Sequence, residues 1–197
     1  GKLYRNKMPL LYRAYERAKS PIMKDLTKFV QAEDWLWDFA LFMAIKARHD
    51  GKSWHQWPMA YKKRDPEVLA NFVKANADEI YFWVFTQYFF KKQWTRLKKY
   101  CNLAQIKLIG DIPIFVSMDS ADVWGNQHLF QLDTKGFPTA VAGVPPDYFS
   151  ATGQLWGNPL YDWDAHDCEG YQWWISRVKN QLQILDILRI DHFRGFE

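Results

Sequence analysis

The sequence predicts an α/β fold in which a mainly helical part, residues 1–104, precedes a part with parallel strands, residues 105–197. Apolar residues in the first hundred positions recur at spacings of three and four, which is typical of helices. Two short, nearly continuous apolar runs, at 106–116 and 184–190, are typical of strands buried on both faces. Between them, positions 171–182 return to helical spacing, and the order strand, helix, strand predicts a parallel pair joined by a right-handed crossover.

The helical part carries the usual signals of helix ends. One apolar face includes Leu36, Phe39 and Ala40, with Asp34 as the expected N-cap before it and Gly51 just after its end. A second helix is expected from the aromatic run at 80–90, which continues at helical spacing to residue 101, while Pro58 and Pro66 break the segment before it.

Composition narrows the class of function. Aromatic residues make up 18% of the chain and include eleven Trp, which suits a protein that stacks flat ligands such as sugars or bases. The net charge of +4, from 26 basic and 22 acidic residues, is too small and too scattered to argue for nucleic acid as a partner.

Cysteine and histidine positions give no sign of a metal or of a cofactor, and none is expected. Cys101 and Cys168 lie far apart without paired-ligand spacing, so neither a zinc site nor a disulfide framework is indicated. We expect a cytoplasmic protein without a membrane partner, because the sequence also lacks an apolar run of about 18 residues and a signal peptide. Four histidines without ligand spacing are expected at the surface: His49, His55, His128 and His166.

The stretch from 117 to 168 is rich in Gly, Pro, Asp and aromatic residues and is expected to be irregular. Connections longer than about 15 residues are uncommon unless they are functional. In an α/β barrel this loop would leave the C-terminal end of a strand, where active sites are built. It is the first place to look for a site.

Two aspartates lie at the ends of the expected strands. Asp191 follows Arg189 by two positions, so both side chains point to the same face, and the guanidinium favours the charged carboxylate that a nucleophile requires. A structural Arg–Asp pair would give the same pattern. Asp111 is flanked by apolar residues and needs partners, either a polyhydroxylated ligand or loop amides. His192 could bond a substrate hydroxyl or be a structural histidine.

The loop also carries aromatic and polar residues close together, namely Asp147, Tyr148, Phe149, Gln154 and Trp156. Pyranose rings pack their apolar faces on aromatic planes while their hydroxyl groups take polar partners. The residues therefore fit a sugar site, and buried packing within the loop explains them equally well.

Four strings make the sequence resemble the amylomaltases (4-alpha-glucanotransferases) of glycoside hydrolase family 77. They are Gly-Asp-Ile-Pro-Ile-Phe-Val at 110–116, Gly-Val-Pro-Pro-Asp-Tyr-Phe-Ser at 143–150, Gly-Gln-Leu-Trp-Gly-Asn-Pro-Leu-Tyr at 153–161 and Arg-Ile-Asp-His-Phe-Arg-Gly-Phe-Glu at 189–197. The resemblance implies part of a (β/α)8 TIM barrel with a helical insertion subdomain. It also implies transfer of α-1,4-glucan segments between maltodextrins with retention at the anomeric carbon.

The resemblance also implies roles. Asp191 would be the nucleophile and Arg189 its electrostatic partner, while Asp111, Trp156 and His192 would line the donor sugar site. Neighbouring sugar subsites would include Asp147, Tyr148, Phe149 and Gln154. The family takes its acid/base carboxyl group from a later strand, and Glu197 is not at that position. We therefore expect a chain truncated after an early barrel strand, inactive by itself and in need of the remainder of the barrel.

Two other readings stay open. An α-amylase-type hydrolase would share the barrel and the chemistry, but would shorten glucans without elongating any. A non-catalytic glucan-binding module would use the aromatic loop without a nucleophile.

Overall fold

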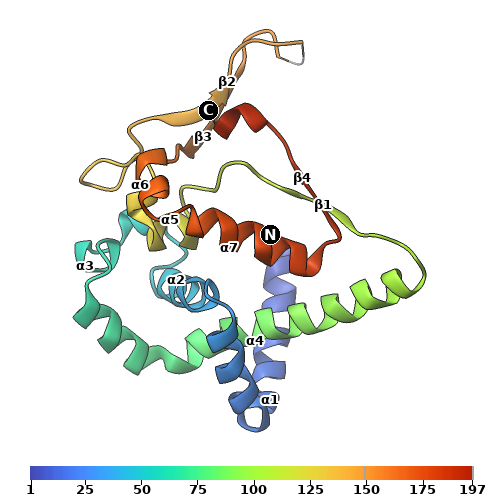
Figure 1. Ribbon diagram of the computed structural model, residues 1–197. Helices are drawn as coiled ribbons and strands as arrows, with labels where there is room; N and C mark the ends of the chain where they lie inside the picture. The colour runs from blue at the N-terminus through green and yellow to red at the C-terminus, as the bar shows by residue number, and fades with distance from the viewer. Residues whose placement is uncertain (149, 197) are drawn as a thin grey trace. The chain divides into compact units, whose positions relative to one another are not determined.

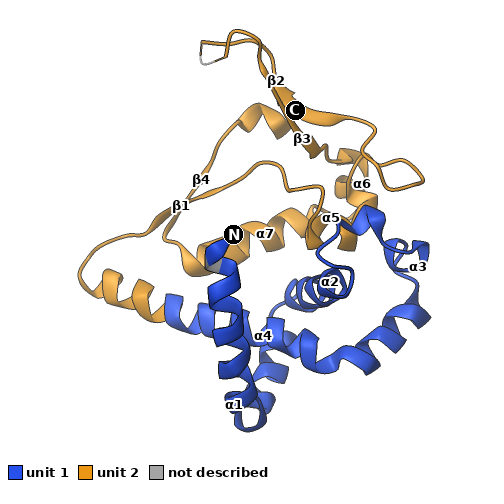
Figure 2. Cartoon of the chain, turned by 180° about the vertical axis from the view of Figure 1, so that it is seen from behind, with its two compact units in different colours: residues 1–94 blue, residues 95–197 orange. Residues whose placement is uncertain are grey.

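The structure is a computed structural model that describes residues 1–148 and 150–196, with only the backbone of Leu3. The chain forms two compact units, residues 1–94 and 95–197, which Figure 2 colours separately. The division falls inside a helix, earlier in the chain than the division predicted after residue 104. Among the described residues, no helix is both long and apolar enough to cross a membrane.

The first unit is helical, as the spacing of apolar residues predicts. Its elements are α1 (Lys2–Ala32), α2 (Leu36–Arg48), the 3-10 helix η1 (Trp54–Gln56), α3 (Met59–Lys62) and most of α4 (Pro66–Leu103). The predicted face of α2 is confirmed in part, since Leu36 and Ala40 are fully buried while Phe39 is half-buried. The long aromatic helix is confirmed as α4, which begins at Pro66, where the missing N–H of proline costs no hydrogen bond.

The predicted N-cap of α2 is wrong, whereas its end is as expected. Asp34 lies in a turn and Trp35 occupies the cap position, because the backbone carbonyl of Glu33 accepts the hydrogen bond from the N–H of Leu36 at 3.0 Å. At the other end Gly51 has φ of +72°, and its N–H donates to the carbonyl of Lys46 at 2.9 Å. Glycine is suited to this left-handed conformation, which closes the helix.

The second unit contains the end of α4, two strand pairs and short helices (Figure 1). Its elements are β1 (Ile109–Ile112), α5 (Ala121–Gly125), η2 (Gln127–Leu129), β2 (Val141–Val144), β3 (Gln154–Pro159), α6 (Trp163–Cys168), α7 (Gln172–Ile184), β4 (Ile187–Ile190) and η3 (Phe193–Phe196). The predicted parallel pair is confirmed, because β1 pairs with β4 in parallel. Helix α7 comes directly before β4 in the chain, as the predicted order of strand, helix and strand requires.

Strand β1 is shorter than the apolar run that predicts it. The run continues to Val116, but β1 ends at Ile112 because Pro113 has no N–H to donate to a neighbouring strand. Residues 113–116 therefore follow the strand as a segment of their own, with Ile114 and Val116 buried. Apolar character there reflects burial and not strand pairing.

The expectation of an irregular stretch at 117–168 is wrong in part, because it contains the antiparallel pair of β2 and β3 as well as α5 and α6. The pairing has a register shift between Val141 and Gly143, which hides its alternation from a sequence pattern. Gly143 is required by a close approach, since a Cβ atom there would lie 2.6 Å from the carbonyl oxygen of Gln154.

The surface placement predicted for the histidines is wrong for His166. This side chain is buried in α6 among the rings of Tyr161, Trp163 and Trp173, and burial lowers the pKa of its imidazole. Aromatic neighbours distant in sequence cover it, which a single-sequence pattern does not show. His128 is exposed and pairs with Glu169, whereas His49 and His55 are half-buried.

Candidate active site

The candidate site lies at the carboxyl ends of the parallel pair. In the register of β1 and β4, Asp111 is opposite Arg189, and Asp191 comes directly after β4. Alternate residues of a strand share a face, so the two strand ends present two carboxylates and one guanidinium on the same side. This is the edge of a parallel sheet at which α/β proteins bind their ligands.

Arg189 links the two carboxylates. Its Nε donates to Oδ1 of Asp111 and its Nη2 to Oδ2, both at 2.7 Å, and the same Nη2 lies 3.4 Å from Oδ2 of Asp191. Hydrogen bonding to Asp111, followed by the charges of Asp111 and Asp191, raises the pKa of Arg189. The guanidinium is therefore a fixed positive charge between two aspartates.

The two aspartates differ in how they are engaged. Asp111 has both oxygens bonded to Arg189, a partner that neither sequence-based expectation for this residue included. Asp191 receives only the longer contact at Oδ2, and its side chain is 56% exposed. Within the described part of the chain, Oδ1 of Asp191 accepts no hydrogen bond. Asp191 thus combines a nearby cation with an accessible oxygen, which is what a nucleophilic carboxylate requires.

A group of rings lies beside Asp191, and we call the rings of Trp156, His192 and Phe115 the aromatic wall. The ring of Trp156 meets the ring of His192 edge-on with centroids 4.6 Å apart, and the ring of Phe115 lies 6.3 Å from Trp156. Nε1 of Trp156 donates to Oε1 of Gln154 at 3.0 Å. His192 has φ of +54°, an uncommon conformation for a residue other than glycine, which is a backbone feature often seen at functional sites.

Sequence reasoning missed Phe115 as part of this wall. The signal was present, because Phe115 follows Pro113 closely, and a proline at the end of an apolar run marks the end of a strand. The run was instead interpreted as strand throughout.

The connection between β2 and β3, which we call the hairpin tip, contains two further predicted sugar-site residues, Asp147 and Tyr148. Oδ1 of Asp147 accepts from the N–H of Ser150 at 2.8 Å, and the side chain of Tyr148 is 97% exposed. The predictions for Phe149 and Glu197 lie outside the described residues. The structure thus brings Trp156, Gln154 and His192 to the neighbourhood of Asp191 and leaves Tyr148 exposed at the tip.

The described residues contain no set of side chains arranged as metal ligands. No group of three or more His, Cys, Asp or Glu side chains there is arranged to hold a metal ion, and Cys101 and Cys168 are free thiols.

The fold and the site define an α/β protein with a charged, carboxylate-bearing site at the ends of its parallel strands. A family model described as 4-alpha-glucanotransferase, glycoside hydrolase family 77, matches residues 1–197, and the chain belongs to this family.

Similar proteins agree with this assignment. The chain is 48% identical over 200 residues to a 4-alpha-glucanotransferase of Streptococcus pneumoniae and 47% identical over 202 residues to one of Thermus thermophilus, in each case with 100% of this chain aligned. A solved structure, an amylomaltase from Streptococcus agalactiae in complex with acarbose, matches 99% of the chain with a TM-score of 0.93 and 43% identity. The chain spans only 40% of the length of each of these relatives.

Proposed function

We propose that this chain is part of a 4-alpha-glucanotransferase that moves α-1,4-glucan segments between maltodextrins by a retaining double displacement. The observation that carries the proposal is the placement of Asp191, exposed at the end of β4 with one uncommitted oxygen, beside Arg189 and the Trp156–His192 wall. In the first step Asp191 would attack the anomeric carbon and form a glycosyl-enzyme, and the leaving part of the donor would depart as the leaving group oxygen is protonated.

The similar proteins support glucan as the substrate class. The relatives that share nearly half of their aligned residues with this chain are 4-alpha-glucanotransferases, and the similar solved structure is a complex with acarbose. We assign Trp156, His192 and Asp111 to the donor sugar site and Gln154, Asp147, Tyr148 and Phe149 to neighbouring subsites. The exposed ring of Tyr148 at the hairpin tip is suited to stacking on a pyranose.

The proton donor of the reaction would come from outside this chain. Retaining enzymes need a second carboxyl group about 5 Å from the nucleophile, which acts first as acid and then as base. Asp111 is linked to Asp191 through Arg189, but both of its oxygens accept hydrogen bonds from the guanidinium, so neither is directed toward a leaving group. A further carboxylic acid from a later strand of a longer protein would fill the role.

The surface of the second unit supports completion by more of a (β/α)8 barrel. Parallel sheets are normally buried on both faces, yet Ile109 is 66% exposed and Ile187 43% exposed in the pair of β1 and β4. An apolar cavity of about 1130 Å³ is open beside α7 and β4. Its lining includes Trp163, Trp174, Ile175, Val178, Ile190 and Phe196. We propose that later strands and helices of the barrel cover these surfaces.

Substitution of the nucleophile in the full-length protein tests the proposal. With maltotriose as the substrate, the wild type should release glucose and form longer maltodextrins, and Asp191→Asn should lower the rate by about 10⁴-fold, as loss of a catalytic residue does. Asp25→Asn, at an exposed position of α1 in the first unit, is the matched control and should leave the rate unchanged.

Other products would point to the other readings. Shortening of the substrate without elongation would identify a hydrolase of the α-amylase type. Binding of maltodextrin with no turnover, and with no effect of Asp191→Asn, would identify a glucan-binding module. The 197-residue chain itself should show no transfer, and glucose release by it that disappears in Asp191→Ala would contradict the need for a second carboxyl group.

A further inference from the structure

The segment that follows β1 is fixed by side chains from two other parts of the second unit. Residues 113–116 come directly after the strand that carries Asp111, and two of them, Ile114 and Val116, are buried. Backbone carbonyl groups removed from water need hydrogen-bond donors, and among the described residues no strand pairs with this segment to supply them. Three side chains donate to them instead.

Tyr161 provides the central contact. Its hydroxyl donates to the carbonyl oxygen of Ile114 at 2.7 Å, and the residue is only 2% exposed. Its ring stacks on Phe115, with centroids 5.8 Å apart and an interplanar angle of 19°. Burial raises the pKa of Tyr161, so the hydroxyl remains protonated and able to donate at any pH at which the protein works.

Arg177 and Asn158 complete the network. Nη2 of Arg177 donates to the carbonyl oxygen of Pro113 at 2.7 Å, and its Nη1 lies 3.4 Å from the Tyr161 hydroxyl oxygen. The guanidinium is placed by the rings of Trp173 and Trp174, whose centroids lie 5.2 and 4.9 Å from its central carbon. Nδ2 of Asn158 donates to the carbonyl oxygen of Val116 at 2.8 Å.

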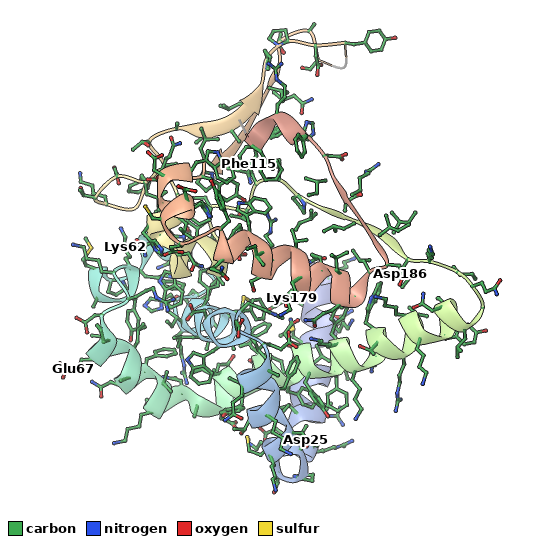
Figure 3. All side chains as sticks on the ribbon, viewed as in Figure 1. Asp25, Lys62, Glu67, Phe115, Lys179 and Asp186 are labelled. Atoms are coloured by element: carbon green, nitrogen blue, oxygen red, sulfur yellow. The ribbon has the colours of Figure 1, made fainter. Side chains whose placement is uncertain are left out.

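These contacts join the three segments that build the candidate site. Residues 113–116 extend the strand that carries Asp111, while Asn158 lies in β3 two positions after Trp156. Arg177 lies in α7, which leads into β4 and Asp191. Figure 3 labels Phe115 in the segment that the network fixes, beyond the end of β1.

We propose that Tyr161 and Arg177 are positioning residues for glucan transfer. By fixing the backbone just after Asp111, they keep both oxygens of its carboxylate bonded to Nε and Nη2 of Arg189, and this in turn directs Nη2 toward Asp191. This inference rests on the proposed function. It assigns a catalytic consequence to a network, centred on the buried Tyr161, that does not touch the nucleophile.

A purely structural role would differ in its effect on the kinetic constants. If the network positions Arg189 and Asp191, loosening it misplaces groups that act in the transition state, so kcat falls while KM changes little. A network that only stabilises the fold lowers Tm and leaves kcat of the folded enzyme unchanged.

The test compares Tyr161→Phe, which removes a single hydroxyl, with Tyr100→Phe in the full-length protein. Tyr100 is a tyrosine on α4 that is 73% exposed, and it serves as the matched control. Tyr161→Phe should lower kcat by roughly tenfold, as small misplacements of catalytic groups do, with KM changed less than kcat. Tyr100→Phe should change neither.

A second variant covers the case in which Tyr161→Phe does not fold. Arg177→Lys keeps the positive charge near the tryptophans but replaces the two guanidinium nitrogens that reach Pro113 and Tyr161 by a single nitrogen, and it should show the same lower kcat with KM changed less. A lower Tm with unchanged kcat in the folded variants would overturn the inference while leaving the proposed function intact. If the wild type forms no maltodextrins that are longer than its substrate, the proposed function itself is overturned, and the inference with it.

Discussion

The two ends of the β1–β4 pair hold carboxylates in opposite ways. At the amino ends, Asp186 precedes β4, and its Oδ2 accepts from the N–H of Leu108 at 2.8 Å and from Nδ2 of Asn102 at 2.9 Å. Lys98 lies 3.5 Å from its Oδ1. At the carboxyl ends, Asp191 has one contact of 3.4 Å and an exposed side chain. Figure 3 labels Asp186 at the turn that leads from α7 into β4.

The difference separates a carboxylate held by structural donors from an accessible one. Asp186 accepts hydrogen bonds from donors of its own unit, including a backbone N–H. Asp191 keeps an oxygen available for a ligand, while Arg189 lies 3.4 Å from its other oxygen. This matches the general division of α/β barrels, in which the amino ends of the strands contribute stability and the carboxyl ends contribute chemistry.

After loss of the nucleophile itself, the largest effect is expected when Asp111 at the carboxyl ends is neutralised. In Asp111→Asn the amide NH₂ would face a donor of Arg189, so the guanidinium would lose its bidentate partner and its aim at Asp191. We expect kcat/KM for transfer in the full-length protein to fall about 10²-fold, by analogy with other misplaced catalytic groups.

The control for this variant is another exposed ion pair in the same unit. Glu169→Gln removes the partner of His128, 2.6 Å away in the wild type, and should leave transfer unchanged. Tm should change little in either variant, because exposed ion pairs contribute little to stability. A large loss of Tm in Asp111→Asn would make its carboxylate structural and erase the contrast between the two ends.

A smaller effect, and on stability only, is expected at the amino ends. Asp186→Asn offers a single acceptor oxygen to the donors of Leu108, Asn102 and Lys98, and it should lower the Tm of the 197-residue chain by roughly 5 °C. Transfer by the full-length protein at a temperature well below Tm should be unchanged. Thermal unfolding followed by circular dichroism measures Tm, and glucose release from maltotriose measures transfer.

The difference in stability between the wild type and Asp186→Asn should change with pH in a definite direction. Hydrogen bonding from the Leu108 N–H, and then from Asn102, lowers the pKa of Asp186 below its ordinary value of 3.8. The stabilisation is therefore fully present above about pH 4 and is lost as the pH falls through the lower pKa of the folded state. The difference in Tm between wild type and Asp186→Asn should shrink below pH 4, and a constant difference would contradict the assignment.

The smallest effect is expected from Lys98→Met. Its Nζ donates to the carbonyl oxygens of Leu182, Gln183 and Leu185 at 3.3, 3.2 and 2.8 Å, where a positive charge also favours the end of α7. Loss of the ammonium should cost about 1 kcal/mol of the free energy of unfolding. Urea denaturation measures it, with Lys99→Met, one residue along the same helix and exposed, as the control. Equal losses in the two variants would remove Lys98 from the structural network.

Local patterns were enough to predict the helices of the first unit and the parallel pair of the second. Spacings of three and four reported the buried faces of α2 and α4, and short apolar runs reported β1 and β4. The alternation of side chains along a strand also placed Arg189 beside Asp191, and the contact between them confirms it. Each of these features depends on residues close to one another in the chain.

Features that depend on distant residues were predicted poorly. The β2–β3 pair has a register shift and tight glycine contacts, so its alternation is masked. His166 was expected at the surface, but aromatic rings from elsewhere in the second unit cover it. The partner of Asp111 was not anticipated, because Arg189 is opposite it only when the two strands are in register.

The sequence by itself determined the helices, the two strands, the pairing of Arg189 with Asp191 and the family strings, because these are set by spacing along one chain segment. Only the tertiary structure decided that Arg189 also takes both oxygens of Asp111, and that Tyr161, Arg177 and Asn158 fix the backbone after β1. The physical reason is that a hydrogen bond depends on distances of about 3 Å between atoms, and such distances between remote residues exist only once the strands and helices have packed.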